Sequence, residues 1–328
     1  MHIRARCMRG GLIKNYHKVK AFADNVDIPD PDIWFHGVSH LPERKDFSNL
    51  YKRLENFKGK LVLFQNNDEL EFNVERVPES LVNKAVLILK AIWPSDSSKI
   101  HPLIRNKTGF LNPFLKPDRA IAGKDLLNRN VKISFYGAAT SFSQYTRVEA
   151  LRMLRDAGIP FEGGLCRDST IPVEPPEDLL KPSIKKSEYL SLLGDTQISL
   201  ALHGYNPLTF RLFESFSRRC LVIAQDLSDI RFVDCGLTPG LHYLSVKKDL
   251  SDLVERTRYY LEHPDEAQKI ADAGFNHFRK YFQYSGVDLP QPLYREVVKT
   301  WSGIDMKQGS FTPFALGFRL ILPLIHSL

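Results

Sequence analysis

The sequence predicts an α/β protein of two domains, each built around a parallel β-sheet. Short apolar runs alternate with longer amphipathic segments along most of the chain, which is the pattern of strands joined by crossover helices. The alternation breaks at residues 100–118, which contain three prolines and few helix formers. A length of 328 residues also suits two domains better than one.

We therefore expect a first domain over residues 1–124 and a second over residues 125–282. Residues 283–328 are expected to return to the first domain as a helix and an apolar tail. Ligands of such sheets bind beyond the carboxyl ends of the strands. The two domains are therefore expected to face a central cleft.

The first domain is expected to alternate strands and helices from its beginning. Its strands are expected at residues 2–7, 32–37 and 60–65. A glycine-containing loop that opens a helix is expected at residues 8–23, and further helices are expected at residues 48–57 and 78–92. Pro78 is well placed in the first turn of the last helix.

The second domain repeats this alternation. Its strands are expected at residues 131–137, 159–164, 197–204, 221–225 and 242–246. Its helices are expected at residues 144–158, 187–195, 208–219, 249–263 and 264–282. In the first of these helices Val148, Leu151 and Leu154 share one face, and Gly158 lies where a helix commonly ends.

The charge and the cysteines limit the function. The net charge is +7, from 45 basic and 38 acidic residues that are dispersed along the chain. This balance fits phosphorylated small molecules or an anionic membrane surface as well as nucleic acid. No Cys-x-x-Cys pair occurs among Cys7, Cys166, Cys220 and Cys235, so we expect reduced thiols in a cytoplasmic compartment and no zinc.

No secretory signal is visible at the start of the sequence, which lacks an uninterrupted apolar stretch. The apolar residues 311–328 are interrupted by Arg319 and two prolines and are short for a spanning helix. We expect this tail to dock on the protein itself. Peripheral membrane contact, through the tail or the basic surface, is the alternative.

A loop after the expected strand at residues 131–137 is the first candidate for an anion site. Gly137 allows a tight turn, and Thr140 and Ser141 offer hydroxyl and amide groups near a helix start. Arg147, early in that helix, would add a bidentate cation. The alternative is that this small-residue loop is only a turn.

A second loop follows the expected strand at residues 197–204. Gly204, Tyr205 and Asn206 form its turn, and Arg211 then lies within the first helical turn, where the helix dipole disfavours a cation. A bound diphosphate would explain Arg211, and Glu214 could accept hydrogen bonds from a ribose diol. The alternative is a surface ion pair between Arg211 and Glu214.

Residues 198–232, with their Arg-x-x-Glu and the apolar strand that follows, resemble the nucleotide-sugar-binding half of glycosyltransferases with two Rossmann-like domains, the GT-B fold. Exostosin-like and group 1 members are similar here. Residues 236–278 resemble glycosyltransferase family 90, the capsule xylosyltransferases and protein O-glucosyltransferases, in which a His-Tyr strand precedes an Asp-Leu-Ser-Asp-Leu helix and an Ile-Ala-x-x-Gly segment. The loop at Gly137 is similar to that family's Arg-Gly-Ser-Arg-Thr-Ser loop, although Tyr136 and Ala139 replace its arginines.

The resemblance implies transfer of a hexosyl or pentosyl group from a nucleotide sugar to a hydroxyl of a glycan or other acceptor. Many retaining group 1 enzymes have a first glutamate where Asn206 stands, so inversion is expected. Asp30 and Asp32 precede a strand and read as a turn, so no obligatory metal is expected, and no cofactor beyond the donor.

Catalysis by inversion needs a base for the acceptor hydroxyl and a cation for the leaving diphosphate. Arg211 is the expected cation. The base is expected in the first domain, where His36, His40 and Asp68 end strands or follow them. The resemblance to family 90, which uses a carboxylate, favours Asp68 over His36.

Three other classes of protein remain as alternatives. A sugar-nucleotide epimerase has the same fold and needs no separate acceptor. A nucleic-acid-binding protein would need clustered Lys and Arg with exposed aromatic residues, whereas the basic residues here are dispersed, so no nucleic-acid partner is expected. A non-catalytic scaffold with a decayed site is a further alternative.

Overall fold

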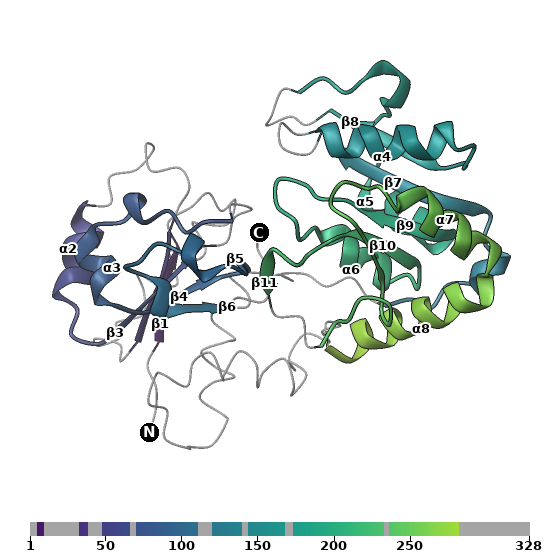
Figure 1. The fold of residues 1–328 in the computed structure, drawn as a ribbon. Coiled ribbons are helices and arrows are strands. Elements are labelled where there is room, and N and C mark those ends of the chain that lie inside the picture. The colour runs from purple at the N-terminus through teal and green to yellow at the C-terminus, as the bar shows by residue number, and fades with distance from the viewer. Residues whose placement is uncertain are drawn as a thin grey trace. The chain divides into compact units, whose positions relative to one another are not determined.

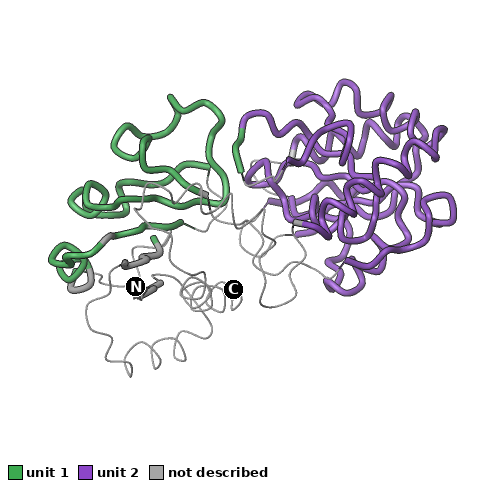
Figure 2. The backbone as a smooth tube through the Cα atoms, turned by 90° about the horizontal axis from the view of Figure 1, so that it is seen from below, with its two compact units in different colours: residues 1–116, 230–233, 291–328 green, residues 117–229, 234–290 purple. Residues whose placement is uncertain are grey.

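A computed structural model confirms the α/β class (Figure 1). It describes residues 5–9, 33–38, 48–65, 70–110, 120–139, 144–167, 173–232 and 236–281. The described residues fall into two compact units, each with a five-stranded parallel sheet (Figure 2). This is the two-domain, Rossmann-like organisation that the alternation predicted.

Unit 1 contains the sheet of the first half of the chain. Its strand order is β1-β2-β3-β4-β6. The strands are β1 (Ala5–Arg9), β2 (Ile33–Gly37), β3 (Lys60–Gln65), β4 (Ala85–Lys90) and β6 (Thr108–Phe110). Its helices α2 (Ser48–Asn56) and α3 (Glu79–Lys84) pack on one another, and three short 3-10 turns lie at Val74–Arg76, Ser97–Lys99 and Arg105–Lys107. The predicted helix at residues 8–23 lies largely outside the described residues.

The prediction of one helix over residues 78–92 was wrong. The helix ends at Lys84, and Ala85–Lys90 forms strand β4 between β3 and β6. Apart from Val86, the residues of β4 are buried. A strand covered on both faces is a continuous apolar run, which sequence periodicity does not separate from a buried helix.

Unit 1 also includes a segment from much later in the chain. Strand β5 (Ile92–Pro94) pairs antiparallel with β11 (Ile230–Phe232). The buried Trp93 side chain fixes β5 to the sheet, because its indole nitrogen donates to the Gly109 carbonyl at 2.7 Å. The sequence predicted neither strand, and it assigned residues 230–232 to the second domain.

Unit 2 contains the second sheet, in the order β12-β10-β9-β7-β8. The strands are β7 (Val131–Ala138), β8 (Glu162–Cys166), β9 (Thr196–Ala201), β10 (Leu221–Gln225) and β12 (Leu244–Val246). The helices are α4 (Gln144–Asp156), α5 (Lys186–Gly194), α6 (Phe210–Phe216), α7 (Leu253–Glu262) and α8 (Pro264–Tyr281), with 3-10 turns at Leu126–Asn128 and Glu177–Leu179. Helices α4 and α7 pack together, and α6 packs on both α5 and α8.

The predicted domain boundary between Lys124 and Asp125 differs from the packing. Residues 120–124 pack with unit 2: the Ile121 amide donates to the Ser217 carbonyl at 2.9 Å, and the Lys124 carbonyl accepts from Arg129 at 2.9 Å. The predicted return of residues 283–328 to the first domain lies outside the described residues.

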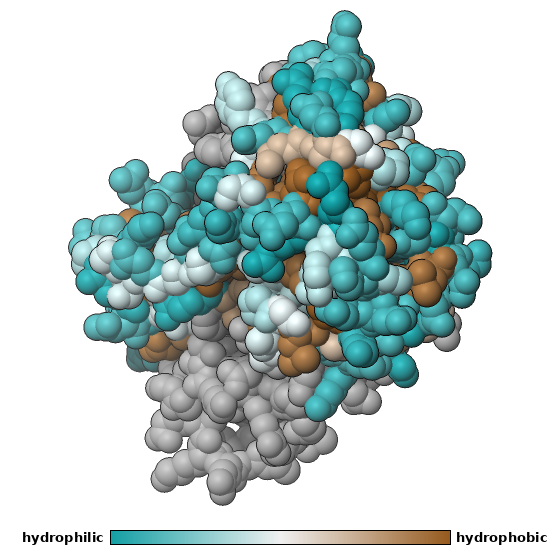
Figure 3. Space-filling view, turned by 45° about the vertical axis from the view of Figure 1, so that its right-hand side comes forward, coloured by the Kyte–Doolittle hydropathy of each residue, from teal (hydrophilic) through white to brown (hydrophobic). Residues whose placement is uncertain are grey.

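The described residues present a mostly hydrophilic surface on one face of the molecule (Figure 3). On the face drawn in Figure 3, hydrophilic residues cover most of the coloured surface and apolar residues gather in limited areas. Among the helices that the structure describes, none has the length and apolar character needed to cross a membrane.

Candidate functional site

The sheet of unit 2 reverses its strand order beside β7. The chain passes from β7 to its neighbour β8 and then returns to β9 on the other side of β7. Open parallel sheets bind ligands beyond the carboxyl ends of the strands at such a reversal. The loops at this place, β7–α4 and β9–α6, lead to the predicted donor-binding residues. Thr140 and Ser141 in the first loop lie outside the described residues.

Arg147, in the first turn of α4, joins these two loops. The residue is only 5% exposed. Its Nε donates to the His203 carbonyl at 2.9 Å, and its Nη1 donates to the Ala138 carbonyl at the end of β7. Arg147 therefore bridges the carboxyl ends of β7 and β9. The sequence had predicted only a direct contact between Arg147 and an anion.

Arg211 reaches the same place from α6. Its Nη2 donates to the Tyr136 carbonyl, and its Cζ lies 4.6 Å from the centroid of the Phe135 ring. The Cζ of Arg147 lies 5.7 Å from that same ring. Among the described residues, the buried Nε of Arg211 has no hydrogen-bond partner. Two guanidinium groups therefore meet over one aromatic side chain.

Two glycines make room for these guanidinium groups. A Cβ at Gly137 would lie 2.8 Å from Cζ of Phe135 and 3.0 Å from Nη2 of Arg211. A Cβ at Gly204 would lie 2.8 Å from Nη2 of Arg147. Gly137 and Gly204 are thus needed for close approach of an arginine to the backbone, one at each strand end.

The site has an excess of positive charge. Burial, and then the positive charge of Arg211, lower the pKa of Arg147 to about 9. Arg147 is still protonated at neutral pH because this pKa lies well above 7. Within the described ranges, no carboxylate forms an ion pair with Arg147 or Arg211. Neighbouring like charges of this kind are stabilised when an anion binds between or beside them.

Glu214 lies on the same face of α6 as Arg211 but has a different partner. Its carboxylate pairs with Nζ of Lys186 at 3.3 Å, and no ion pair joins it to Arg211 in the described structure. The other face of α6 is buried through Leu212, Phe213, Ser215 and Phe216. Ser215 is fixed to β9 by a 2.7 Å hydrogen bond with Ser199. The three-residue spacing of Arg211 and Glu214 therefore places both side chains on the face of α6 that is not buried, but they do not form an ion pair with each other.

The turn before α6 is held by its own backbone and by Asn206. The Gly204 amide donates to the Asn206 carbonyl at 3.0 Å, and Asn206 Oδ1 accepts from the Leu208 amide at 2.7 Å. Tyr205 is 40% exposed at the tip of this turn. Asn206 therefore shapes the loop that carries Arg211.

The predicted base candidates are only partly within the described structure. The backbone of His36 lies in β2, next to the last residue of that strand and paired with Leu63 of β3. His40 and Asp68 lie outside the described residues. The prediction of a first-domain base therefore stays a prediction.

Three residues at the site were missed from the sequence: Phe135, Lys186 and Tyr189. Phe135 read as an ordinary core residue of a predicted strand. Lys186 and Tyr189 belong to α5, which packs against α6. No local pattern announces such a contact, because it depends on how two helices meet.

Comparison with known proteins finds similarity to glycosyltransferases. Residues 164–287 match a family model described as "Glycosyl transferase-like". Protein O-glucosyltransferase 2 of Danio rerio is 34% identical over 74 residues, a match that covers 18% of this chain and 15% of that protein.

Solved structures show the same fold at low sequence identity. The sucrose-phosphate synthase of Thermosynechococcus elongatus matches with a TM-score of 0.50 and 13% identity, over 89% of this chain and 79% of that one. The α,α-trehalose-phosphate synthase of Burkholderia xenovorans, described as UDP-forming, matches with a TM-score of 0.51 and 13% identity, over 88% and 77%. TarM matches with a TM-score of 0.52 and 9% identity, over 87% and 57%. Family 90 in particular stays a prediction. The chain has the two-domain GT-B fold of these solved structures, and its residues 164–287 are similar to glycosyltransferases.

Proposed function

We propose that the chain transfers a sugar from a nucleotide-sugar donor to a hydroxyl of a glycan or glycoconjugate acceptor. The observation that carries this proposal is the pair of guanidinium groups of Arg147 and Arg211 over Phe135, at the strand reversal of unit 2. A diphosphate supplies the negative charge that this place lacks among the described residues. The UDP-forming synthase with the same fold supports a diphosphate leaving group.

Arg211 is the group that acts on the leaving diphosphate. The acceptor oxygen attacks the anomeric carbon, the bond from that carbon to the diphosphate oxygen breaks, and the diphosphate leaves with the electron pair. Its growing negative charge is stabilised by the Arg211 guanidinium. Arg147 is too enclosed to move freely. It holds the two loops together and adds a second positive charge.

The remaining parts of the proposal rest on the sequence. The proton of the acceptor hydroxyl passes to Asp68 in preference to His36. The anomeric configuration is inverted, because Asn206 replaces the first glutamate of the retaining pattern. No metal or further cofactor takes part. Contact with a membrane surface, if the acceptor is a lipid-linked glycan, would use the basic surface or the C-terminal tail.

Binding and product analysis test the proposal. Titration with UDP, GDP and ADP should identify a nucleoside diphosphate that binds, and incubation of the matching nucleotide sugar with candidate acceptors in EDTA should yield a glycoside. Nuclear magnetic resonance of that linkage should show inversion. A retained configuration would contradict inversion, and full activity of Asp68→Asn would contradict the role of Asp68 as the base. Dependence on a metal would contradict a metal-independent reaction. Conversion of the donor sugar without any acceptor would indicate an epimerase.

Glu214→Ala should weaken binding of the nucleoside diphosphate but not of inorganic pyrophosphate. The reason is that the carboxylate is proposed to accept from the ribose hydroxyls, and hydrogen bonds to charged groups contribute about 1.5–3 kcal/mol. Lys186→Met removes the present partner of Glu214 and keeps the carboxylate, so it should reduce the affinity less than Glu214→Ala does. Calorimetric titration with both ligands gives the comparison. Equal loss of pyrophosphate affinity would place Glu214 outside the ribose contact.

Gly137→Ala should weaken nucleoside diphosphate binding roughly fivefold, which corresponds to about 1 kcal/mol. The added methyl group would lie 2.8 Å from Cζ of Phe135 and 3.0 Å from Nη2 of Arg211, so the ring and the guanidinium that packs near it must shift. Gly194→Ala, where a Cβ meets nothing within 4 Å, is the control. Titration and thermal unfolding of both variants separate a local shift of Arg211 from a general loss of stability. Unchanged affinity in Gly137→Ala would show that the position of Arg211 does not matter.

A further inference from the structure

The hydroxyl of Tyr189 is a buried polar group without a hydrogen-bond partner among the described residues. Tyr189 lies in α5, which packs against α6. Buried hydroxyl groups in native proteins nearly always have a partner, so one without a partner needs an explanation. A hydroxyl without a well-formed hydrogen bond contributes little to the stability of the fold, because phenylalanine would fill the same space without burying a polar oxygen.

The unpaired Nε of Arg211 is the complementary group. It lies on α6, which packs against the helix of Tyr189, and it is likewise buried without a hydrogen bond of good geometry among the described residues. Burial raises the pKa of Tyr189, while the charge of Arg211 and an incomplete hydrogen bond with its side chain lower it. The two groups are therefore close together without a hydrogen bond of good geometry. The net shift is upward, so Tyr189 is a neutral hydroxyl at physiological pH and can accept a hydrogen bond from the Nε–H group.

The other contacts of Arg211 explain why this hydrogen bond matters for a ligand. Nη2 is engaged by the Tyr136 carbonyl, and the guanidinium plane lies near the Phe135 ring. A guanidinium has five N–H donors in a fixed plane. A hydrogen bond to Nε therefore fixes the direction of the other N–H groups of Arg211. Without that bond, the guanidinium can rotate about the hydrogen bond between Nη2 and the Tyr136 carbonyl.

We propose that Tyr189 is a positioning residue of the donor site, whose hydroxyl accepts from Nε of Arg211 when a diphosphate is bound and so directs the remaining N–H groups of Arg211 toward the phosphates. This inference rests on the proposed function. It predicts that the Tyr189 hydroxyl acts only through Arg211 and only on the diphosphate part of the ligand.

A double-mutant cycle on the full chain tests the inference. UDP and uridine are titrated into the wild type, Tyr189→Phe, Arg211→Ala and the double variant. We expect Tyr189→Phe to weaken UDP binding about five- to tenfold in the wild type and less than twofold in Arg211→Ala. Uridine binding should not change. The melting temperature of Tyr189→Phe should equal or exceed that of the wild type. Tyr259→Phe, which removes a hydroxyl hydrogen-bonded to Glu266 on the surface, is the matched control and should leave UDP affinity unchanged.

The outcomes separate this inference from the function on which it rests. If the wild type binds UDP and Tyr189→Phe has no effect, or has the same effect with and without Arg211, the positioning role is wrong while the donor site stands. A lowered melting temperature with parallel losses of UDP and uridine affinity would assign Tyr189 to the fold alone. If the wild type binds none of UDP, GDP and ADP, the proposed donor site falls, and the role of Tyr189 with it.

Discussion

Arg211→Ala is expected to weaken UDP binding by about 10- to 100-fold and to lower the turnover of the sugar transfer as well. Hydrogen bonds from a charged donor contribute about 1.5–3 kcal/mol, and each 1.4 kcal/mol is a factor of ten in affinity. The diphosphate carries more negative charge in the transition state than in the bound donor, so the loss should appear in kcat in addition to the dissociation constant. The measurements are calorimetric titration and donor turnover.

A surface arginine provides the control for this variant. Arg256 lies on α7, pairs with Asp252 and has a side chain that is 46% exposed. Arg256→Ala should bind UDP as the wild type does. Arg211→Ala should also fold normally, because it removes an unpaired Nε and a like charge next to Arg147. Wild-type affinity and turnover in Arg211→Ala would show that Arg211 supports only the Tyr136 carbonyl.

The sequence predicted the parts of unit 2 that local pattern determines. The strand Leu221–Gln225, for example, is a buried and mostly apolar run that follows an amphipathic helix, and this pattern predicted its position. The two loops of the candidate site were located for the same reason, since each follows such a strand. The resemblance to known glycosyltransferases then added a chemical meaning that periodicity alone does not give.

The sequence failed where distant packing decides the structure. Ala85–Lys90 could have continued the preceding helix, but it pairs with β3 and β6 as a strand. Residues 230–232 follow a strand of unit 2 yet pair with β5 of unit 1. In both cases the partner strand is supplied from elsewhere in the chain, and no window of local sequence contains it.

The contacts of single side chains at the candidate site were likewise only partly predictable from local sequence. The unusual place of Arg211 at a helix start indicated an anion, and the structure adds a second guanidinium over the same Phe135 ring. The partners themselves were not predictable. Lys186 pairs with Glu214, and Tyr189 lies beside Arg211, because α5 and α6 pack together across many intervening residues.

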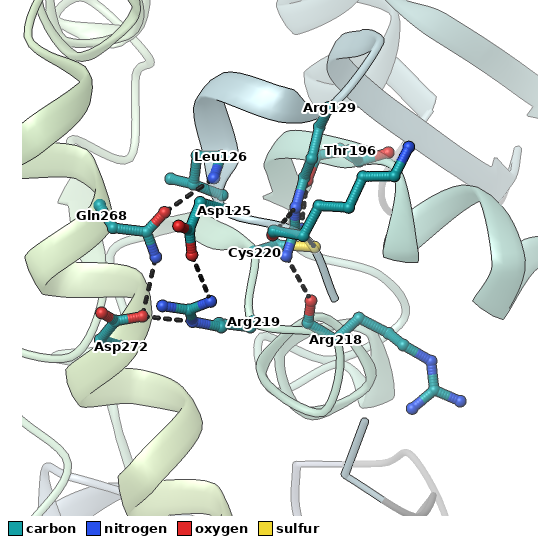
Figure 4. Close-up of polar contacts among 10 residues, drawn as sticks. Asp125, Leu126, Arg129, Thr196, Arg218, Arg219, Cys220, Gln268 and Asp272 are labelled. Atoms are coloured by element: carbon teal, nitrogen blue, oxygen red, sulfur yellow. Dashed lines mark hydrogen bonds and ion pairs between the residues drawn. The ribbon is translucent and has the colours of Figure 1, made fainter. Parts of the chain in front are cut away.

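Arg129→Met is expected to lower the free energy of unfolding of unit 2 by about 3 kcal/mol or more. Arg129 is 3% exposed, and its guanidinium donates to the carbonyls of Thr196 at 2.7 Å and Arg218 at 3.0 Å (Figure 4). It also donates to the carbonyl of Lys124 at 2.9 Å. It thus ties the segment before β7, the start of β9 and the turn after α6. Methionine can fill much of the space, but it leaves these carbonyls without their donor, and each buried unsatisfied group costs about 1–3 kcal/mol.

Arg219→Met is the matched control, because Arg219 also holds separate segments together but does so nearer the surface. Its guanidinium pairs with Asp125 and Asp272, whose side chains are 63% and 38% exposed. Exposed ion pairs contribute roughly 0–1 kcal/mol, so this variant should lose much less stability than Arg129→Met. Urea unfolding of both variants decides the matter. Similar losses would mean that water replaces Arg129 at the three carbonyls. A clearly larger loss in Arg129→Met would identify this buried arginine as the side chain that joins the segment before β7, the start of β9 and the turn after α6.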